Sequence, residues 1–416
     1  MDSIDFLVIG AGPAGLMAAI KAADEGLRVT ILEAMPKPAR KLGISGKGRG
    51  NLTNTAPYEA FLQHFNNQGR FLKSAFKTFF TTDLIRFLAT EGLETVEERG
   101  GRVFVASGKA TDAVNCLHKA IQKRRVRLIT GCRAKRILVD DGRCLGVEGE
   151  DGQYLSAATL IATGGLSYPV TGSTGDGLRL AREIGHEIIT PFPSLVPLTP
   201  DPPIHRSLKG LLLKNVRAEL RCDGKKIADE FGEMAFLDGY LTGPILLTLS
   251  RKSVPLLTKN KKIEAVIDLK PALDHQKLDQ RLLREFDRHR GEKLETVLKR
   301  LLPSALIGFC LNNTDLEAEL PVSQIKAAER RTLRNWLKAV SFTIVGHAPW
   351  DQAIITAGGV STKQINSSTM ESKLIQNLYF AGEVIDIDAD TGGFNLQAAF
   401  STGYLAGLSA AKAVKS

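Results

Sequence analysis

The chain has 416 residues, 43% of them hydrophobic, and a formal net charge of +10. This length exceeds one hydrophobic core, so we expect two or three domains, and the composition excludes wholesale disorder. No apolar run reaches the ~18–20 residues of a membrane span. The five cysteines are scattered, which is typical of reduced thiols and not of a structural metal. We therefore expect a soluble, cytoplasmic protein with no metal, no signal peptide and no membrane partner.

The first 33 residues predict a dinucleotide-binding unit. Residues 4–9 form an apolar run of strand length, Gly10–Gly15 reads Gly-Ala-Gly-Pro-Ala-Gly, and a helical pattern follows. The first glycine permits a tight turn, the second lets the backbone approach a pyrophosphate, and the third lets helix and strand pack closely. The unpaired N–H groups at the start of the helix favour binding of the phosphates. Glu33 follows a second strand at 28–32 and would bind ribose hydroxyls but repel a 2′-phosphate, which predicts FAD or NAD.

The segment 37–54 is rich in glycine and contains Lys41, Lys47 and Arg49. We expect an irregular loop whose backbone and positive charge approach the cofactor. We next expect helices over 71–91 and 111–123. Short strands are expected at 127–130, 134–139, 144–148 and 154–157, and the strands at 134–139, 144–148 and 154–157 should form a meander. A buried strand is expected at 160–165. The loop 166–177, which contains Tyr168 and several glycines, is more typical of a ligand-lining loop than of a spacer. A helix to residue 184 follows.

Six prolines between residues 191 and 203 indicate a domain boundary. The region 192–350 contains 26 Lys and Arg against 19 Asp and Glu, and so carries +7 of the net charge. We expect in it a hairpin over 216–230 and long helices over 278–302 and 321–340. Its basic surface is either the solvated face of these helices or a surface that meets an anionic polymer such as RNA, although no nucleic-acid-binding motif accompanies it.

The C-terminal part returns to strands that end in glycine. We expect strands at 354–360 and 377–383, and a last helix from the Gly392-Gly393 pair to residue 410. The carboxylate of Glu383 can bind ribityl hydroxyls, and the N–H groups of the helix start can face the carbonyl edge of an isoalloxazine. That edge becomes negative on reduction, so the helix start would stabilise reduced flavin. An NAD enzyme needs no such C-terminal return, so we predict FAD.

These motifs resemble the bacterial YhiN/BaiN-like family of two-domain FAD flavoproteins. The resemblance is carried by residues 10–15, 41–54, 162–177, 357–360, 369–373 and 378–397. It implies an α/β fold, with a Rossmann-like FAD-binding domain over 1–191 and 351–416 and an insertion at 192–350 that holds a small β-barrel and a helical subdomain. It also implies an oxidoreductase that reduces a carbon–carbon double bond next to a carbonyl. The family includes a ribosomal RNA dihydrouridine synthase and a bile-acid reductase.

The motifs and the resemblance together give a predicted set of cofactor-binding residues. They are Gly10, Gly12, Pro13, Ala14, Gly15, Glu33, Ala34, Lys41, Leu42, Ser45, Gly46, Arg49, Asn51, Ala134, Thr163, Gly164, Gly165, Asp176, Gly382, Glu383, Asp386, Gly393, Asn395 and Leu396. Two positions depart from the family pattern. Gly50 stands where the family usually has cysteine, and Asp238 stands where it usually has histidine, so neither usual side chain is available as a proton donor.

The reaction we expect is hydride transfer. NADH or NADPH would reduce FAD, the flavin would deliver hydride to an electron-poor alkene carbon, and a protein acid would protonate the neighbouring carbon. The candidate acids are Tyr168, Asp238 and Lys47, in that order. Tyr168 could equally pack beneath the ring before Pro169, and Asp238 would need a raised pKa. No second Rossmann motif appears, so the nicotinamide would dock transiently or the electrons would come from another protein.

Three functions are consistent with these features. The first is reduction of a uracil in ribosomal RNA, with the basic insertion on the RNA and the base flipped to the flavin. The second is reduction of small, steroid-like enones. The third is a non-enzymatic flavin-dependent redox sensor or RNA-binding protein. The family and the basic insertion together favour the first.

Overall fold

The structure is a computed structural model in which residues 3–65 and 68–416 are described. The chain forms two compact units, one made of Met1–Ser194 with Trp350–Ser416 and the other of Leu195–Pro349. The second unit is therefore an insertion in the sequence of the first.

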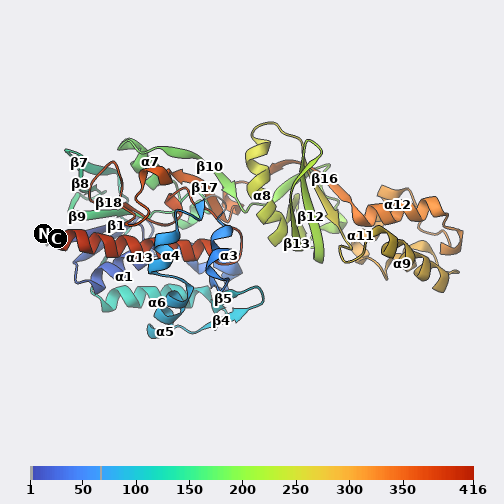
Figure 1. The fold of residues 1–416 in the computed structure, drawn as a ribbon, viewed down its shortest axis with the longest axis horizontal. Coiled ribbons are helices and arrows are strands. Elements are labelled where there is room, and N and C mark those ends of the chain that lie inside the picture. The colour runs from blue at the N-terminus through green and yellow to red at the C-terminus, as the bar shows by residue number, and fades with distance from the viewer. Residues whose placement is uncertain (1–2, 66–67) are drawn as a thin grey trace. The chain divides into compact units, whose positions relative to one another are not determined.

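A parallel sheet forms the centre of the first unit (Figure 1). Its strands lie in the order β6 (Arg127–Thr130), β2 (Val29–Glu33), β1 (Ile4–Ile9), β9 (Gln153–Ile161) and β18 (Leu378–Phe380). Val8 of β1 is in register with Ile31 of β2 on one side and with Leu160 of β9 on the other. The central strands are near-continuous apolar runs because helices and loops bury both faces of the sheet. This confirms the predicted Rossmann-like arrangement.

Strand β9 takes part in two kinds of pairing. Its first half pairs antiparallel with β8 (Arg143–Glu148), and β8 pairs with β7 (Arg136–Asp140), which gives the predicted meander. Its second half pairs parallel with β1 and β18. The prediction of two strands, at 154–157 and 160–165, is wrong because no glycine or proline interrupts the chain between them.

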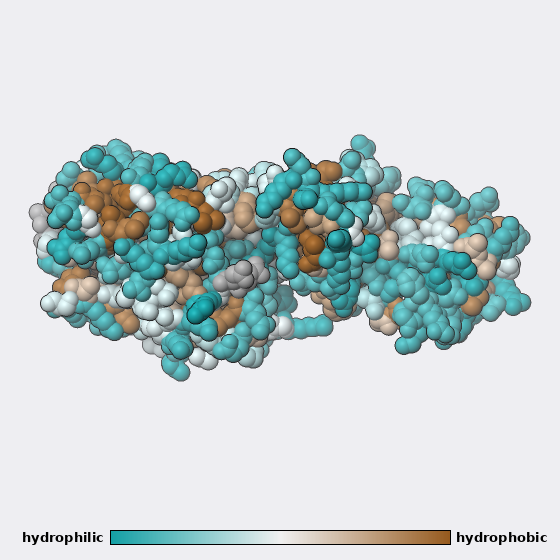
Figure 2. All heavy atoms as spheres, turned by 45° about the horizontal axis from the view of Figure 1, so that its top comes forward, coloured by the Kyte–Doolittle hydropathy of each residue, from teal (hydrophilic) through white to brown (hydrophobic). Residues whose placement is uncertain are grey.

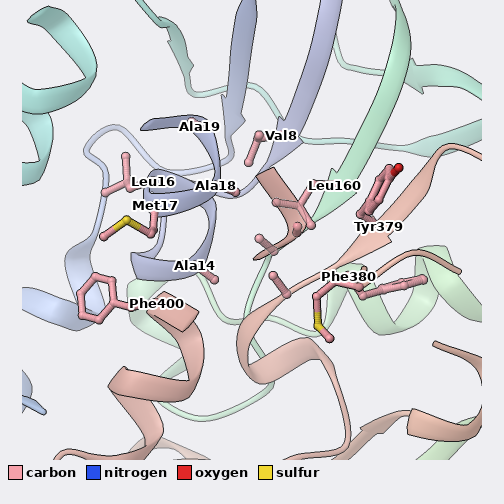
Figure 3. Packing of buried hydrophobic residues seen from close by; sticks show 14 of the residues in the cluster. Val8, Ala14, Leu16, Met17, Ala18, Ala19, Leu160, Tyr379, Phe380 and Phe400 are labelled. Atoms are coloured by element: carbon pink, nitrogen blue, oxygen red, sulfur yellow. The ribbon is translucent and has the colours of Figure 1, made fainter. Parts of the chain in front are cut away.

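Two helices from opposite ends of the sequence pack side by side on this sheet. They are α1 (Pro13–Asp24) and α13 (Phe394–Lys415), and they run alongside each other in Figure 1. A Cβ atom added at Gly403 would lie 2.2 Å from the carbonyl oxygen of Ala14, so only glycine allows this approach. Figure 3 shows the surrounding core, with Met17 of α1 and Phe400 of α13 both buried. Close packing thus fixes the start of α13 relative to the glycine motif.

The remaining elements of the first unit differ in part from the predictions. They include α2 (Arg40–Gly43), the 3-10 helix η1 (Ser45–Gly48), α3 (Tyr58–Gln63), α4 (Lys73–Thr78), α5 (Thr81–Thr90), α6 (Ala110–Lys123) and α7 (Asp176–Glu183), a three-stranded sheet of β3 (Asn51–Asn54), β5 (Arg102–Val105) and β4 (Thr95–Glu98), and the pair β10 (Ile188–Ser194) and β17 (Ile355–Val360). The irregular loop expected at 37–54 therefore holds short helices and a strand. The single helix expected at 71–91 breaks before Thr81, because Asp83 turns back to accept the backbone N–H of Phe80 (2.9 Å).

The insertion unit contains a closed barrel and a group of helices. The barrel order is β11 (Leu198–Asp201), β14 (Tyr240–Thr242), β13 (Lys225–Leu237), β12 (Leu212–Cys222), β15 (Ile263–Asp268) and β16 (Val340–His347). The helices are α8 (Pro244–Leu257), α9 (His275–Arg288), α10 (Leu294–Leu298), α11 (Ser304–Thr314) and α12 (Ala327–Lys338). The surface over α9 and α12 is mostly hydrophilic in Figure 2. The fold class expected from the resemblance is confirmed.

Two helices of the insertion are shorter than predicted. The helix expected over 278–302 is divided into α9 and α10, with Gly291 between them. The helix expected over 321–340 begins only at Ala327, where Glu329 accepts the backbone N–H of Lys326 (2.6 Å). In both cases a local turn or cap competes successfully with the helical pattern.

Candidate cofactor site

The glycine motif has the geometry that its sequence predicts. Gly10 has φ +101°, and a Cβ atom there would lie 2.6 Å from the carbonyl oxygen of Ala162. A Cβ atom at Gly15 would lie 2.0 Å from the carbonyl oxygen of Gly10, so Gly15 is required for packing of the helix on the turn. Gly12 differs, because a Cβ atom there would meet no protein atom within 4 Å. Contacts within the protein therefore explain why residues 10 and 15 are glycine. At Gly12 no protein atom fills the space that a side chain would occupy.

That space is part of a cleft in the first unit. The predicted residues that line it are Gly10, Gly12, Pro13, Ala14, Glu33, Ala34, Lys41, Leu42, Ser45, Ala134, Thr163, Gly164, Asp176, Gly382, Glu383, Asn395 and Leu396. Tyr168 lines it as well. The cleft thus brings together residues from both ends of the chain. It also lies at the carboxyl ends of β1, β2 and β9, where doubly wound folds bind their ligands.

Glu33 is held at the end of β2 by two backbone amides. The N–H of Ala11 donates to one carboxylate oxygen (2.7 Å) and the N–H of Met35 donates to the other (2.8 Å). Burial raises the pKa of Glu33, whereas these two amides act in the opposite direction. Each oxygen retains a lone pair, so the fixed carboxylate can accept hydrogen bonds from vicinal hydroxyls.

Basic side chains surround the same part of the cleft. Lys37, Arg40, Lys41 and Arg133 are among the lining residues. Arg133 is paired with Asp176 and also donates to the hydroxyl of Thr174 (3.3 Å). Guanidinium and ammonium groups beside a helix N-terminus suit a pyrophosphate. The space at Gly12, the carboxylate of Glu33 and these cations together fit a dinucleotide.

Lys41 and Glu383 meet on the wall of the cleft. The Lys41 Nζ lies 2.6 Å from Glu383 Oε2, and it also contacts the Ser167 hydroxyl. Ser167 donates to Glu383 Oε1 (2.6 Å), which also accepts the backbone N–H of Thr356 (2.9 Å). The Thr356 hydroxyl in turn accepts the backbone N–H of Leu166 (2.7 Å). Four segments far apart in sequence are thus joined in one network.

The start of α13 also reaches the cleft. Asn395 and Leu396 line it, and their backbone N–H groups belong to the first turn, which a helix leaves without internal partners. The Asn395 side chain accepts from the N–H of Ala389 (2.8 Å) and donates to its carbonyl oxygen (3.0 Å). The helix start is therefore held in a defined orientation.

Seven predicted cofactor-binding residues do not line the cleft. They are Gly15, Gly46, Arg49, Asn51, Gly165, Asp386 and Gly393. Arg49 is paired with Glu98 and lies over the ring of Phe104. Gly393 has φ +102°, and a Cβ atom there would lie 2.3 Å from the carbonyl oxygen of Thr53.

Asp386 accepts a hydrogen bond from Gln68 (2.9 Å). Burial and the nearby Asp388 raise the pKa of Asp386 to about 6. For Asp386 and the other six residues outside the lining, a direct contact with the cofactor remains a prediction.

The three candidate acids have different surroundings. Tyr168 lines the cleft in a left-handed conformation (φ +50°), and its N–H donates to the carbonyl oxygen of Trp350 (3.1 Å). Burial, with a smaller contribution from Asp351, raises the pKa of Tyr168, so its hydroxyl keeps its proton at neutral pH. Lys47 lies in the exposed turn η1, outside the cleft lining.

Asp238 lies in the insertion unit on an exposed turn. Its carboxylate is 2.7 Å from the ammonium of Lys209, which lowers its pKa. That shift is opposite to the one a proton donor needs at neutral pH.

Sequence reasoning missed several residues of this site. Ser167 and Thr356 complete the network of Lys41 and Glu383, and Lys37, Arg40 and Arg133 supply positive charge. Arg40 stands next to Lys41, and Arg133 precedes the predicted Ala134, so both were detectable as basic residues beside expected contacts. Ser167 and Thr356 have no such signal, because their partners are distant in sequence.

Residues 3–65 and 68–416 contain neither a candidate metal site nor a candidate membrane span. No group of three or more His, Cys, Asp or Glu side chains there could hold a metal ion. Within the same described residues, no helix has the length and apolar composition needed to cross a membrane.

The fold and the cleft define a dinucleotide-binding protein of the Rossmann type. The chain belongs to the HI0933-like family, because the model of the HI0933-like protein Rossmann domain matches residues 4–409. This is the family expected from the sequence resemblance. Membership supports FAD as the dinucleotide and makes the protein a flavin oxidoreductase by family.

Relatives from several bacteria match over nearly the whole chain. The 3-dehydro-bile acid delta(4,6)-reductase of Clostridium scindens is 29% identical over 409 residues, which is 97% of this chain and 98% of the relative. The ribosomal RNA dihydrouridine synthase of Haemophilus influenzae is 30% identical, with 97% of each chain covered.

Solved structures show the same fold at low sequence identity. Quinol fumarate reductase of Escherichia coli has a TM-score of 0.54 at 15% identity, and covers all of this chain and 71% of its own. The 3-ketosteroid-delta4-(5alpha)-dehydrogenase of Rhodococcus jostii has a TM-score of 0.51 at 15% identity, with 99% and 97% covered.

Proposed function

We propose that this protein is an FAD-dependent reductase of carbon–carbon double bonds conjugated to a carbonyl, and that its electrons come from NADH or NADPH. The observation that carries the proposal is the cleft in which the glycine motif, Glu33 and the start of α13 meet. Two of the relatives that match over nearly the whole chain support it: one is named a reductase of a bile acid, and the other is named a synthase of dihydrouridine, the product of reducing the carbon–carbon double bond of uridine.

The chain's own residues have separate roles in this proposal. The space at Gly12 admits the pyrophosphate, Glu33 binds the ribose, and Glu383 binds the ribityl chain from its network with Lys41. Bound FAD supplies the hydride for the substrate carbon. The N–H groups of Asn395 and Leu396 stabilise negative charge at the carbonyl edge of the ring.

Tyr168 is the proposed proton donor. Of the three candidate acids only Tyr168 lines the cleft, and its raised pKa keeps the hydroxyl protonated at neutral pH. Its left-handed backbone, tied to Trp350, holds the side chain in place. A fixed neutral hydroxyl can protonate the carbon next to the one that accepts hydride.

A uracil of ribosomal RNA is the substrate we favour. The insertion carries +7 of the net charge of +10, and the relative from Haemophilus influenzae is named for this reaction. Cations on the insertion would bind phosphates and position the RNA without reading its sequence. The target base would leave its stack to reach the flavin.

A small enone is the second candidate substrate, and a specific observation favours it. More than half of the basic side chains in the insertion are already paired with acidic ones, for example Lys299 with Glu295 and Arg300 with Glu292. Paired cations contribute less to RNA binding than the net charge suggests. The relative from Clostridium scindens is named for reduction of a bile acid.

Mass spectrometry of ribosomal RNA from cells that lack the gene separates the two substrates. We expect the loss of one dihydrouridine, restored by the wild-type gene and not by a Tyr168→Phe variant that is expressed equally. An unchanged RNA modification profile would refute the RNA reaction. Rapid oxidation of NADH or NADPH by the purified protein with an enone alone would then establish the second candidate.

A further inference from the structure

A histidine–aspartate pair stands at the entrance to α13, outside the residues assigned to the cofactor above. His64 caps the C-terminal end of α3, and its Nδ1 lies 2.8 Å from Asp390 Oδ2. The backbone N–H of Asp390 also donates to the carbonyl oxygen of His64 (3.3 Å). The end of α3 is thus bound to the segment before α13 through both side chain and backbone.

The same histidine contacts the helix itself. Its ring stacks on Phe394, the first residue of α13, with 3.8 Å between ring centroids and 21° between ring planes. Phe61 of α3 packs edge-on against the same ring at 4.8 Å. Asn54 of β3 donates to the carbonyl oxygen of Gly392 (3.0 Å). The start of α13 is therefore held by contacts with both His64 and β3.

The charge of this pair lies close to the part of α13 that faces the cleft. Asp390 precedes the helix cap Gly393 by three residues, and the Asn395 side chain closes this short segment onto the helix. A carboxylate beside a helix N-terminus reduces the positive potential that the helix offers to another anion. A hydrogen bond from His64 Nδ1 to Asp390 Oδ2 offsets part of that negative potential.

We propose that the His64–Asp390 pair positions the start of α13 and sets the charge beside it, and that it thereby tunes the reduction potential of the bound flavin. This inference rests on the proposed binding of FAD, but not on the identity of the substrate. Both residues are positioning residues, because neither lines the cleft. Negative charge on the reduced ring is stabilised when Asp390 is neutralised and destabilised when Asp390 loses its hydrogen bond to His64.

The midpoint potential of the FAD-loaded protein tests this directly, without any substrate. We expect Asp390→Asn to increase the equilibrium constant for flavin reduction by three- to tenfold. This corresponds to a midpoint potential about 15–30 mV higher for a two-electron couple. We expect His64→Phe, which keeps a ring against Phe394, to disfavour reduction by a similar factor. In the Asp390→Asn background, His64→Phe should lose most of its effect, because the charge it acts through is gone.

His64→Gln provides a second variant at the same position. It keeps a hydrogen-bond donor for Asp390, so its potential should fall by less than that of His64→Phe. The matched control is Glu292→Gln in the insertion unit, which alters a His–carboxylate pair with the same 2.8 Å separation from His289 and should leave the potential unchanged. Circular dichroism and flavin content verify that each variant is folded and loaded.

Single variants with wild-type potentials, or fully additive effects in the double variant, would overturn the inference. A wild-type protein that binds no FAD would refute the proposed function and this inference together. A loaded protein that reduces neither uracil nor enones would refute the proposed function alone, because the potentials could still be compared.

Discussion

The ammonium of Lys41 lies 2.6 Å from the carboxylate of Glu383, a residue 342 positions later in the chain. The Lys41 side chain is 24% exposed and that of Glu383 is 12% exposed, so the pair is largely removed from water. It joins the segment after Glu33 to the segment before α13. The pair therefore connects the two ends of the sequence at the cofactor cleft.

Removing one member of this pair should destabilise the protein. We expect Lys41→Met to lower the free energy of unfolding by about 2–3 kcal/mol, because it leaves the Glu383 charge without its partner in a partly buried site. FAD affinity should fall as well. Urea unfolding of the apoprotein and fluorescence titration with FAD measure the two effects.

The double variant Lys41→Met/Glu383→Gln shows whether the charges act as a pair. It should be less destabilised than the sum of the single variants, by about 1–2 kcal/mol. Glu295→Gln is the control, since its exposed pair with Lys299 should contribute less than about 1 kcal/mol. Additive effects of the two single variants would contradict direct coupling.

Substitutions at Gly12 and Gly15 should have different effects, on FAD binding and on protein stability respectively. Gly12→Ala should leave the stability of the apoprotein within about 0.5 kcal/mol of wild type, because the new methyl meets no protein atom, but should weaken FAD binding at least about tenfold. Gly15→Ala should destabilise the apoprotein itself, because its methyl would lie 2.0 Å from the carbonyl oxygen of Gly10. Thermal unfolding without FAD, followed by FAD titration, distinguishes the two. Equal losses of stability would contradict the assignment of Gly12 to the ligand.

Tyr168→Phe should slow reduction of the substrate and leave reduction of the flavin by the nicotinamide unchanged. The expected loss in substrate turnover is about 100- to 10,000-fold, as for removal of a general acid. Since the pKa of Tyr168 is raised, its proton is lost only at strongly alkaline pH, so this donor should cause no decline in rate between neutral pH and about pH 9. Stopped-flow measurement of each half-reaction tests the prediction. A variant slowed equally in both half-reactions would indicate a packing role for Tyr168.

His186 should make the stability of the first unit depend on pH. The residue is 3% exposed, its Nε2 lies 2.9 Å from the Ser372 hydroxyl, and burial lowers its pKa. The neutral form is therefore favoured on folding, so the contribution of His186 is present above its unfolded pKa of about 6.5 and is lost as the pH falls below that value. We expect urea unfolding to show lower stability at pH 5 than at pH 7, and a flatter profile for His186→Phe. His275→Gln, at an exposed position, should keep the wild-type profile.

Much of the fold and part of the site can be predicted from the sequence, and the reasons are physical. Gly10 needs a positive φ in its own turn, Gly15 packs on the carbonyl oxygen of Gly10, and Glu33 follows an apolar strand at a fixed distance, so local spacing contains the information. Ser167 and Thr356 contact Glu383 across long sequence separations, and these contacts form only when β9, β17 and β18 are brought together. The break between α9 and α10 is missed because the apolar pattern continues through a turn at Gly291. The ammonium of Lys209 lowers the pKa of Asp238, whereas a proton donor needs a raised pKa. The sequence does not reveal this pair, because Lys209 belongs to a separate segment.

The flavin content of the purified protein tests the central claim most directly. The claim is that the glycine motif near Gly12 and the helix start near Gly393 bind one flavin dinucleotide between them. We expect a yellow protein with one FAD per chain, which loses its colour on denaturation and regains it when the apoprotein is mixed with FAD. A colourless protein that takes up no FAD on reconstitution would contradict the account.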